Sequence, residues 1–123
     1  MILSDNIVLS DNSILAEDLD AVITNTIIYG SLSEEFLISS SDEADFSLAM
    51  FNSVVRTEND ALNVNGNLIN VDPKFKSPEE YDYSLQDDSP AINNGQNLSI
   101  PTDLEGNDRD ETPDIGAFEN TDD

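Results

Sequence analysis

Only four side chains in this sequence carry a positive charge and could serve as a base toward an acidic substrate. They are Arg56, Lys74, Lys76 and Arg109. The chain has no His and no Cys, which removes imidazole bases, Ser–His triads, the commonest zinc sites, disulfides and thiol chemistry. Proton abstraction beside a carboxylate would therefore rest on one of these four residues, with Ca²⁺ or another cation neutralising the carboxylate.

Two of these cations are close together in the sequence. Lys74 and Lys76 alternate around Phe75, so in an extended strand they would share one face, which could meet an acidic sugar. Lysines on an exposed strand also discourage edge-to-edge aggregation. We favour this second role for the pair.

Oxygen ligands alternate in a loop nearer the C-terminus. Asp103, Glu105 and Asn107 flank a Gly, and Asp114 follows, a pattern similar to a calcium-binding loop because hard cations prefer several oxygen ligands. The sixth position is Asp108 instead of the usual Gly, and the closing bidentate Glu is missing. We keep these three residues as candidate Ca²⁺ ligands, although chance matches are expected in so acidic a chain.

Acidity is the most unusual feature of the composition. Twenty-seven acidic residues against four basic ones give a net charge of -23, which excludes phosphate-binding partners such as nucleic acid and an anionic membrane surface. A solvated surface suited to salty or divalent-rich surroundings is a more ordinary explanation than a dedicated cation site. Paired carboxylates for glycoside hydrolysis are uninformative here, since acids are everywhere.

The length of 123 residues suits one domain. No apolar run approaches the roughly 18 residues of a membrane helix, so we expect no membrane insertion. The first residues lack the basic and apolar regions of a signal peptide. An export signal of a secreted parent protein would therefore lie upstream.

Aliphatic residues occur in short clusters broken by Ser, Asn, Asp and Gly, which predicts many very short strands separated by turns. The clusters are Ile7–Leu9, Ala21–Ile23, Ile27–Tyr29, Phe36–Ile38, Val54–Val55 and Leu68–Ile69. Residues 41–50 could form either a helical turn or a strand.

A local repeat joins several of these clusters. Asn12–Leu15, Asn25–Ile28 and Asn52–Val55 share an Asn, a small hydroxyl residue and two aliphatics. Asn25 and Asn52 are 27 residues apart, a spacing typical of a repeating coil. Stacked coils would place aliphatic rows inside, with Asn at the bends in left-handed conformation and bonded in a ladder. We therefore predict an all-β chain in which residues 1–70 form about three coils of a right-handed parallel β-helix.

The composition of the sequence changes at residue 71, where Pro and Asp become frequent. We expect residues 71–118 to be an irregular cap on the last coil, because a solenoid end exposes backbone groups and core. Phe75 and Leu85 would close the open end of the core. Residues 113–118 would be a final strand anchored by Ile115 and Phe118, and residues 119–123 a disordered tail.

Five segments of the tail occur in the order typical of one protein family. They are Val71–Phe75, Asp82–Leu85, Ser89–Gly95, Thr102–Asn107 and Pro113–Glu119. Together they resemble the C-terminal signature of bacterial right-handed parallel β-helix proteins of the choice-of-anchor Q type, in the pectate-lyase-like superfamily. Residues 25–30 resemble the final coils before it. The Arg109–Thr112 segment departs from the family, which usually has Arg, Pro and Gly there.

The resemblance implies an exported or cell-surface bacterial protein, and many relatives handle polysaccharides. Our leading hypothesis is a non-catalytic C-terminal end of such a protein, directed at polysaccharide. The alternatives are a fragment of a Ca²⁺-dependent polysaccharide lyase and an adhesion or scaffold module with a protein partner. The first coil would expose an unpaired edge. Three arrangements would deal with this edge: residues 1–20 cover it, another copy pairs with it, or the chain is a fragment, which we favour.

Overall fold

The computed structural model describes residues 1–121, and over that range it is all-β, with short strands, two 3₁₀ turns and no α-helix. The strands are β1 (Ile2–Ser4), β2 (Asn6–Val8), β3 (Ile14–Ala16), β4 (Leu19–Thr24), β5 (Ile27–Ile28), β6 (Leu37–Ser39), β7 (Phe46–Phe51), β8 (Val54–Val55), β9 (Leu68–Ile69), β10 (Phe75–Ser77) and β11 (Asp82–Leu85). The 3₁₀ turns are η1 (Asp60–Leu62) and η2 (Pro78–Glu80). The all-β class is confirmed, and residues 46–51 are a strand.

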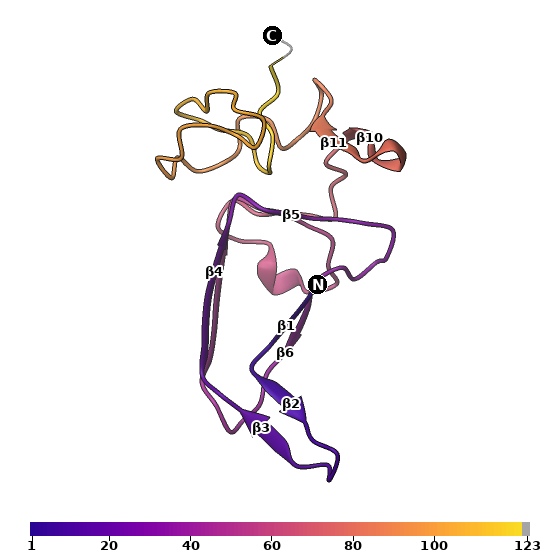
Figure 1. Cartoon of the computed structure of the whole chain (residues 1–123), viewed down its shortest axis with the longest axis vertical. Coiled ribbons are helices and arrows are strands. Elements are labelled where there is room, and N and C mark those ends of the chain that lie inside the picture. Colours follow the sequence, from indigo (N-terminus) through magenta and orange to yellow (C-terminus); the bar gives the residue numbers. More distant parts are fainter. Residues whose placement is uncertain (122–123) are drawn as a thin grey trace.

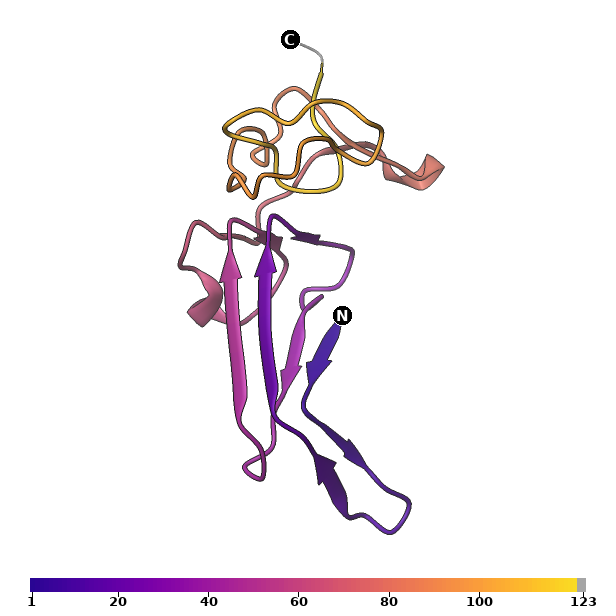
Figure 2. The ribbon, with the colours of Figure 1, turned by 60° about the vertical axis from the view of Figure 1, so that its left-hand side comes forward.

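The first 70 residues are joined by parallel strand pairs. β4 runs beside β7 from Leu19↔Phe46 to Thr24↔Phe51, as Figure 2 shows, and β5 pairs with β8 as Ile27↔Val54. Both ladders have a 27-residue offset, the spacing that the Asn repeat predicted. β1 pairs with β6 in parallel at a larger offset. β9 adds to β8 through Val54↔Leu68, after a return too short for a full repeat.

Inward-facing side chains of these strands form the first core. Phe36, Met50, Val55 and Leu62 are buried together, and partly buried aliphatics from five strands pack against them. Equivalent residues sit side by side, such as Ile23 beside Met50. In Figure 1, β4, β5 and the β1–β6 pair outline three sides of this region, and η1, which supplies Leu62, lies within the outline.

Asn residues turn the chain at the strand ends as predicted. Asn12, Asn25 and Asn52 have φ of 65°, 52° and 43°, a left-handed conformation that Asn tolerates better than most residues. The predicted Asn ladder is wrong, however. The Asn25 amide donates to the carbonyl of Gln96 at 2.7 Å, and the Asn52 amide donates to the carbonyl of Asn94 at 3.0 Å. The side-chain amides of Asn25 and Asn52 therefore hold the tail instead of each other.

One hydroxyl and one amide side chain of the repeat link neighbouring strands. The Thr26 N–H donates to Ser53 Oγ at 3.2 Å, and the Ser53 N–H donates to Asn67 Oδ1 at 3.1 Å. Each step therefore satisfies a backbone donor where the ladder leaves the strands.

Residues 1–20 do not form a plain coil. β2 and β3 pair in antiparallel register, Ile7↔Leu15 and Val8↔Ile14, and the hairpin projects away from the tail in both ribbon views. The Asn12 motif is therefore part of a hairpin loop. All four of these aliphatic side chains are exposed, so the hairpin buries little of its apolar surface.

The tail covers the side of the strand stack and not its end, which corrects our expectation. Val54, Leu85, Ala91 and Ile115 form a second buried core. Val54 and Val55 are consecutive in β8 and point to opposite faces, so one reaches the first core and the other meets the tail. Ile27 and Leu68, from the strands on either side of β8, also pack against the tail. The outer face of the β5–β8–β9 sheet thus needed a cover.

The end of the tail is irregular but firmly bonded. Residues 113–118 contain no strand, and although Ile115 is fully buried, Phe118 is only half-buried. The Glu119 N–H donates to Asp103 Oδ2 at 2.8 Å, and the Asn120 N–H donates to Asp114 Oδ2 at 2.7 Å. These bonds correct the disordered tail that we expected from residue 119, of which residues 122–123 lie outside the described part. Within residues 1–121 no helix has the length and apolarity needed to cross a membrane.

Candidate functional site

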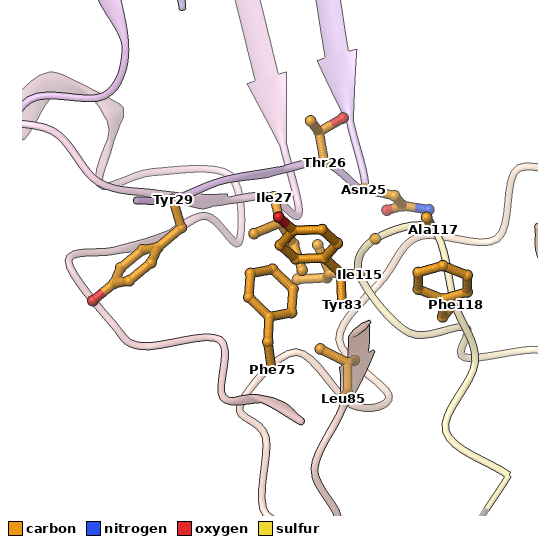
Figure 3. A pocket seen from close by; sticks show the side chains of 11 residues that line it. Asn25, Thr26, Ile27, Tyr29, Phe75, Tyr83, Leu85, Ile115, Ala117 and Phe118 are labelled. Atoms are coloured by element: carbon orange, nitrogen blue, oxygen red, sulfur yellow. The ribbon is translucent and has the colours of Figure 1, made fainter. Parts of the chain in front are cut away.

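An open pocket of about 440 Å³ lies where the tail meets the end of β4 and strand β5. Figure 3 shows most of its side chains around one hollow. They are Asn25, Thr26, Ile27, Tyr29, Phe75, Tyr83, Leu85, Ile115, Gly116, Ala117 and Phe118. Its volume is within the range of small-molecule sites, which are mostly apolar with a few placed polar groups.

Two aromatic rings from the β10–β11 hairpin form one wall. The rings of Phe75 and Tyr83 meet edge to face, with centroids 5.3 Å apart and planes at 86°, a favourable geometry for aromatic pairs. The turn between them has Pro78 at the start of η2 and Tyr81 in left-handed conformation. Asp82 then accepts the backbone N–H of Ser84 at 3.0 Å. The local sequence therefore fixes the angle at which Tyr83 is presented.

The floor depends on a close approach between the tail and the sheet. The Gly116 N–H donates to the carbonyl of Asn25 at 3.0 Å. Gly116 has φ of 115°, and a Cβ there would stand 3.0 Å from Cδ1 of Ile27. The Asn25 side chain is bonded twice to Gln96, because its Oδ1 also accepts the Gln96 N–H at 2.7 Å. These two hydrogen bonds hold the bend at Asn25 against the tail.

Tyr29 separates the apolar pocket from a second, polar depression. The Arg56 guanidinium lies 5.2 Å from the centre of the Tyr29 ring and donates to the carbonyl of Gly30 at 2.9 Å. The depression, of about 290 Å³, is lined by Tyr29, Ser33, Arg56, Thr57, Glu58, Asp60 and Asn70. Arg56 therefore contacts a ring that lines the aromatic pocket, although Arg56 does not itself line the pocket.

The four predicted base residues are not brought together by the fold. Lys74 has φ of 55° and lies outside β10, so it does not alternate with Lys76 along one strand face as expected. Lys74 forms an ion pair with Asp88. Arg109 is half-buried in the tail, far along the chain from the other three.

Arg109 organises the end of the tail. It forms an ion pair with Glu119 and donates to the carbonyls of Asp114 and Gly116. Burial raises the pKa of Glu119 above its ordinary value, and the nearby Asp114 charge raises it further. The Asp114 N–H and the Arg109 charge oppose this rise. The Arg109 cation thus serves the packing of the tail, and it also lines a small depression of about 150 Å³ that shares Asn25 and Gly116 with the aromatic pocket.

Asp103 is a structural bracket in the predicted calcium loop. Its Oδ1 accepts the N–H groups of Glu105 and Asn107 at 2.9 and 2.8 Å. Its Oδ2 accepts the Asn107 side-chain amide at 3.0 Å and the Glu119 N–H. Four donors match the number of lone-pair positions on a carboxylate, so the loop uses Asp103 to bind its own backbone.

The electrostatics of Asp103 agree with this role. Burial alone would raise the pKa of Asp103, but the donors from Glu119, Asn107 and Glu105 outweigh it and lower the pKa to about 2. Glu105 and Asn107 face Asp103 through their N–H groups. Over residues 1–121, no three acidic side chains are grouped in a way that could hold a metal ion.

The aromatic pocket was missed at the sequence level. Phe75 was expected to plug a core, and no role was given to Tyr29 or Tyr83. The available signal was an aromatic residue in each of the two short strands of a tail hairpin. Their rings, from Phe75 and Tyr83, are in contact. Comparisons with protein-family models, with curated proteins and with solved structures found no match to this chain.

Proposed function

We propose that this chain is the C-terminal part of an exported bacterial right-handed β-helix protein, and that it binds polysaccharide without cleaving it. The β-helix proposal is supported by the parallel ladders with a common 27-residue offset and by the three strand groups around one core. The five tail segments quoted above, in their family order, support the exported and bacterial character.

The single observation that carries the binding proposal is the aromatic lining of the pocket. Sugar rings present a face of C–H groups edged by hydroxyls, and such faces pack well on aromatic rings. Four rings line the opening, two of them with a hydroxyl at the tip: Tyr29, Phe75, Tyr83 and Phe118. Tyr83 is 45% exposed, so its ring is available to a ligand.

The same lining favours binding over chemistry. No Asp, Glu, Lys or Arg is among the described residues that line the pocket, so no carboxylate, ammonium or guanidinium is available there for acid–base chemistry. The polar depression has Arg56 beside Glu58 and Asp60. However, Arg56 is engaged with Gly30 and Tyr29, which makes it a poor proton acceptor for a lyase reaction.

Titration calorimetry with a panel of soluble polysaccharides tests the proposal. We expect binding to at least one glycan and a loss of about tenfold or more in affinity for Tyr83→Ala, because the exposed ring contributes contact area. Tyr81→Asn is the matched control, because Asn removes the ring but tolerates the left-handed conformation that residue 81 adopts in the turn. Tyr81 is 84% exposed and precedes the same strand, but it does not line the pocket.

Two results would contradict the proposal. If no glycan binds to the folded chain, the pocket is not a carbohydrate site, and a protein partner becomes the better hypothesis. If unsaturated sugar products accumulate when the chain is incubated with a uronate polymer, measured by their ultraviolet absorbance, then the chain is a lyase and the non-catalytic part of the proposal is wrong.

A further inference from the structure

We propose that the aromatic pocket selects uncharged polysaccharides and rejects carboxylated ones. This inference rests on the proposed function, because it names the class of glycan that the same pocket takes. It differs from the expectation set by the family resemblance, in which some relatives act on uronate polymers.

The pocket offers no cation to a sugar carboxylate. Its described lining consists of apolar, aromatic and uncharged polar side chains. A carboxylate moved into such a site loses its hydration without gaining a charged partner, which is costly. A hydroxyl needs only a neutral hydrogen-bond partner.

The polar groups at the pocket suit hydroxyls. Tyr29 and Tyr83 each carry a phenol that both donates and accepts, as a sugar hydroxyl does. Asn25 is committed to Gln96 through both of its amide atoms, and the Thr26 hydroxyl donates to the carbonyl of Thr24 at 3.0 Å. The two phenols are therefore the side-chain groups best placed to form hydrogen bonds with the hydroxyls at the edge of a sugar ring.

Three cations near the pocket already have partners. Lys74 precedes Phe75 but pairs with Asp88. Arg56 lies over Tyr29 but donates to the carbonyl of Gly30. Arg109 donates to the carbonyl of Gly116, which lines the pocket, but it is paired with Glu119. None of the three could bind a uronate without losing a present contact.

The field of the whole chain acts in the same direction. A net charge of -23 on 123 residues repels a polyanion and slows its approach, while an uncharged polymer is unaffected. Salt weakens this repulsion, since the screening length falls from about 10 Å at 0.1 M to about 3 Å at 1 M. Rejection of acidic glycans should therefore relax as salt is added.

The test begins with a panel of uncharged, carboxylated and amino-sugar polymers, titrated in the presence of a chelator at low salt. Only binding that is weakened in Tyr83→Ala counts as binding to the pocket, because a cationic polymer can attach to the acidic surface elsewhere. We expect the tightest pocket-dependent binder to be uncharged.

A matched pair of derivatives then isolates charge. The tightest uncharged binder is carboxymethylated, and a second sample is hydroxyethylated to the same degree as a control for bulk. We expect the carboxymethyl form to bind about tenfold more weakly at low salt and to recover part of that loss at high salt. The hydroxyethyl form should stay within about threefold of the parent polymer.

The outcomes separate the two proposals. If a carboxylated polymer is the tightest pocket-dependent binder, or if carboxymethylation leaves affinity unchanged, the selectivity is overturned while carbohydrate binding stands. If no polymer binds in a Tyr83-dependent way, the proposed function itself fails, and the selectivity fails with it.

Discussion

Replacing Asp103 by Asn should destabilise the chain by about 2 kcal/mol at neutral pH and by much less near pH 2. The pKa of Asp103 is lowered from its ordinary value of 3.8 to about 2, and each pKa unit corresponds to about 1.4 kcal/mol. The substitution also turns an NH₂ group toward donors. Whichever atom replaces Oδ2 must accept both the Asn107 amide and the Glu119 N–H.

The direction of the pH dependence follows from the lowered pKa. A carboxyl that is more acidic in the folded state stabilises that state above pH 3.8, where both folded and unfolded forms are ionised. This contribution is lost as the pH falls from 3.8 through about 2. The difference in unfolding free energy between wild type and Asp103→Asn should therefore be constant above pH 5 and shrink below pH 4.

Urea unfolding followed by circular dichroism at pH 7, 5, 4, 3 and about 2 measures this difference. Asp108→Asn is the matched control. It removes the same charge from the same loop, and Asp108 is exposed. If the two variants unfold alike at pH 7, or if the Asp103→Asn deficit is equally large near pH 2, the bracket assigned to Asp103 is refuted.

Three further predictions concern the tail approach, the metal and the open end. Gly116→Ala should cost about 1–3 kcal/mol in unfolding free energy, and Gly106→Ala less, because both have positive φ but only at Gly116 does a Cβ meet another side chain, Ile27 at 3.0 Å. Calorimetric titration with millimolar Ca²⁺ should give the same heat for wild type and for Asp103→Asn. A binding heat that is present in wild type and absent in the variant would show that the loop binds Ca²⁺. Light scattering tests for self-association through the N-terminal strands. We expect salt to promote such a dimer, because charge repulsion opposes pairing, and Val22→Asp to abolish it, because Val22 is exposed on β4. A dimer unchanged in that variant would place the contact elsewhere.

The strand ladders were predictable because they depend on local pattern. Asn25 and Asn52 mark equivalent bends, and the 27-residue spacing is the register that the strands adopt. The lateral position of the tail was not predicted, although the sequence holds a signal for it. Val54 and Val55 are consecutive aliphatic residues, which in a strand point to opposite faces of the sheet. Both are fully buried in the structure, so both faces of the sheet are covered. An end cap would have left Val54 in water.

The pocket was harder to predict because its residues come from separate segments. Tyr29 follows β5, Phe75 and Tyr83 belong to the tail hairpin, and Ile115 lies some 30 residues further on. No short motif joins them, and only the docking of the tail brings them together. The acidic loop has two explanations that its sequence does not separate. Its alternating oxygens suggested a cation, but a loop that must bind its own N–H groups selects the same residue types.

Docking of the tail and formation of the pocket are one event in this architecture. Leu85 and Ile115 are buried against Val54 in the second core, and the same two side chains also line the pocket. A tail that lifts from the sheet therefore loses both its own burial and the ligand site. By linkage, a ligand that binds only the docked form stabilises it, by about 2.7 kcal/mol when present at a hundred times its dissociation constant. Glycan binding should thus also stabilise distant contacts of the tail, such as the hydrogen bonds of the Asp103 bracket, although no atom of that bracket lines the pocket.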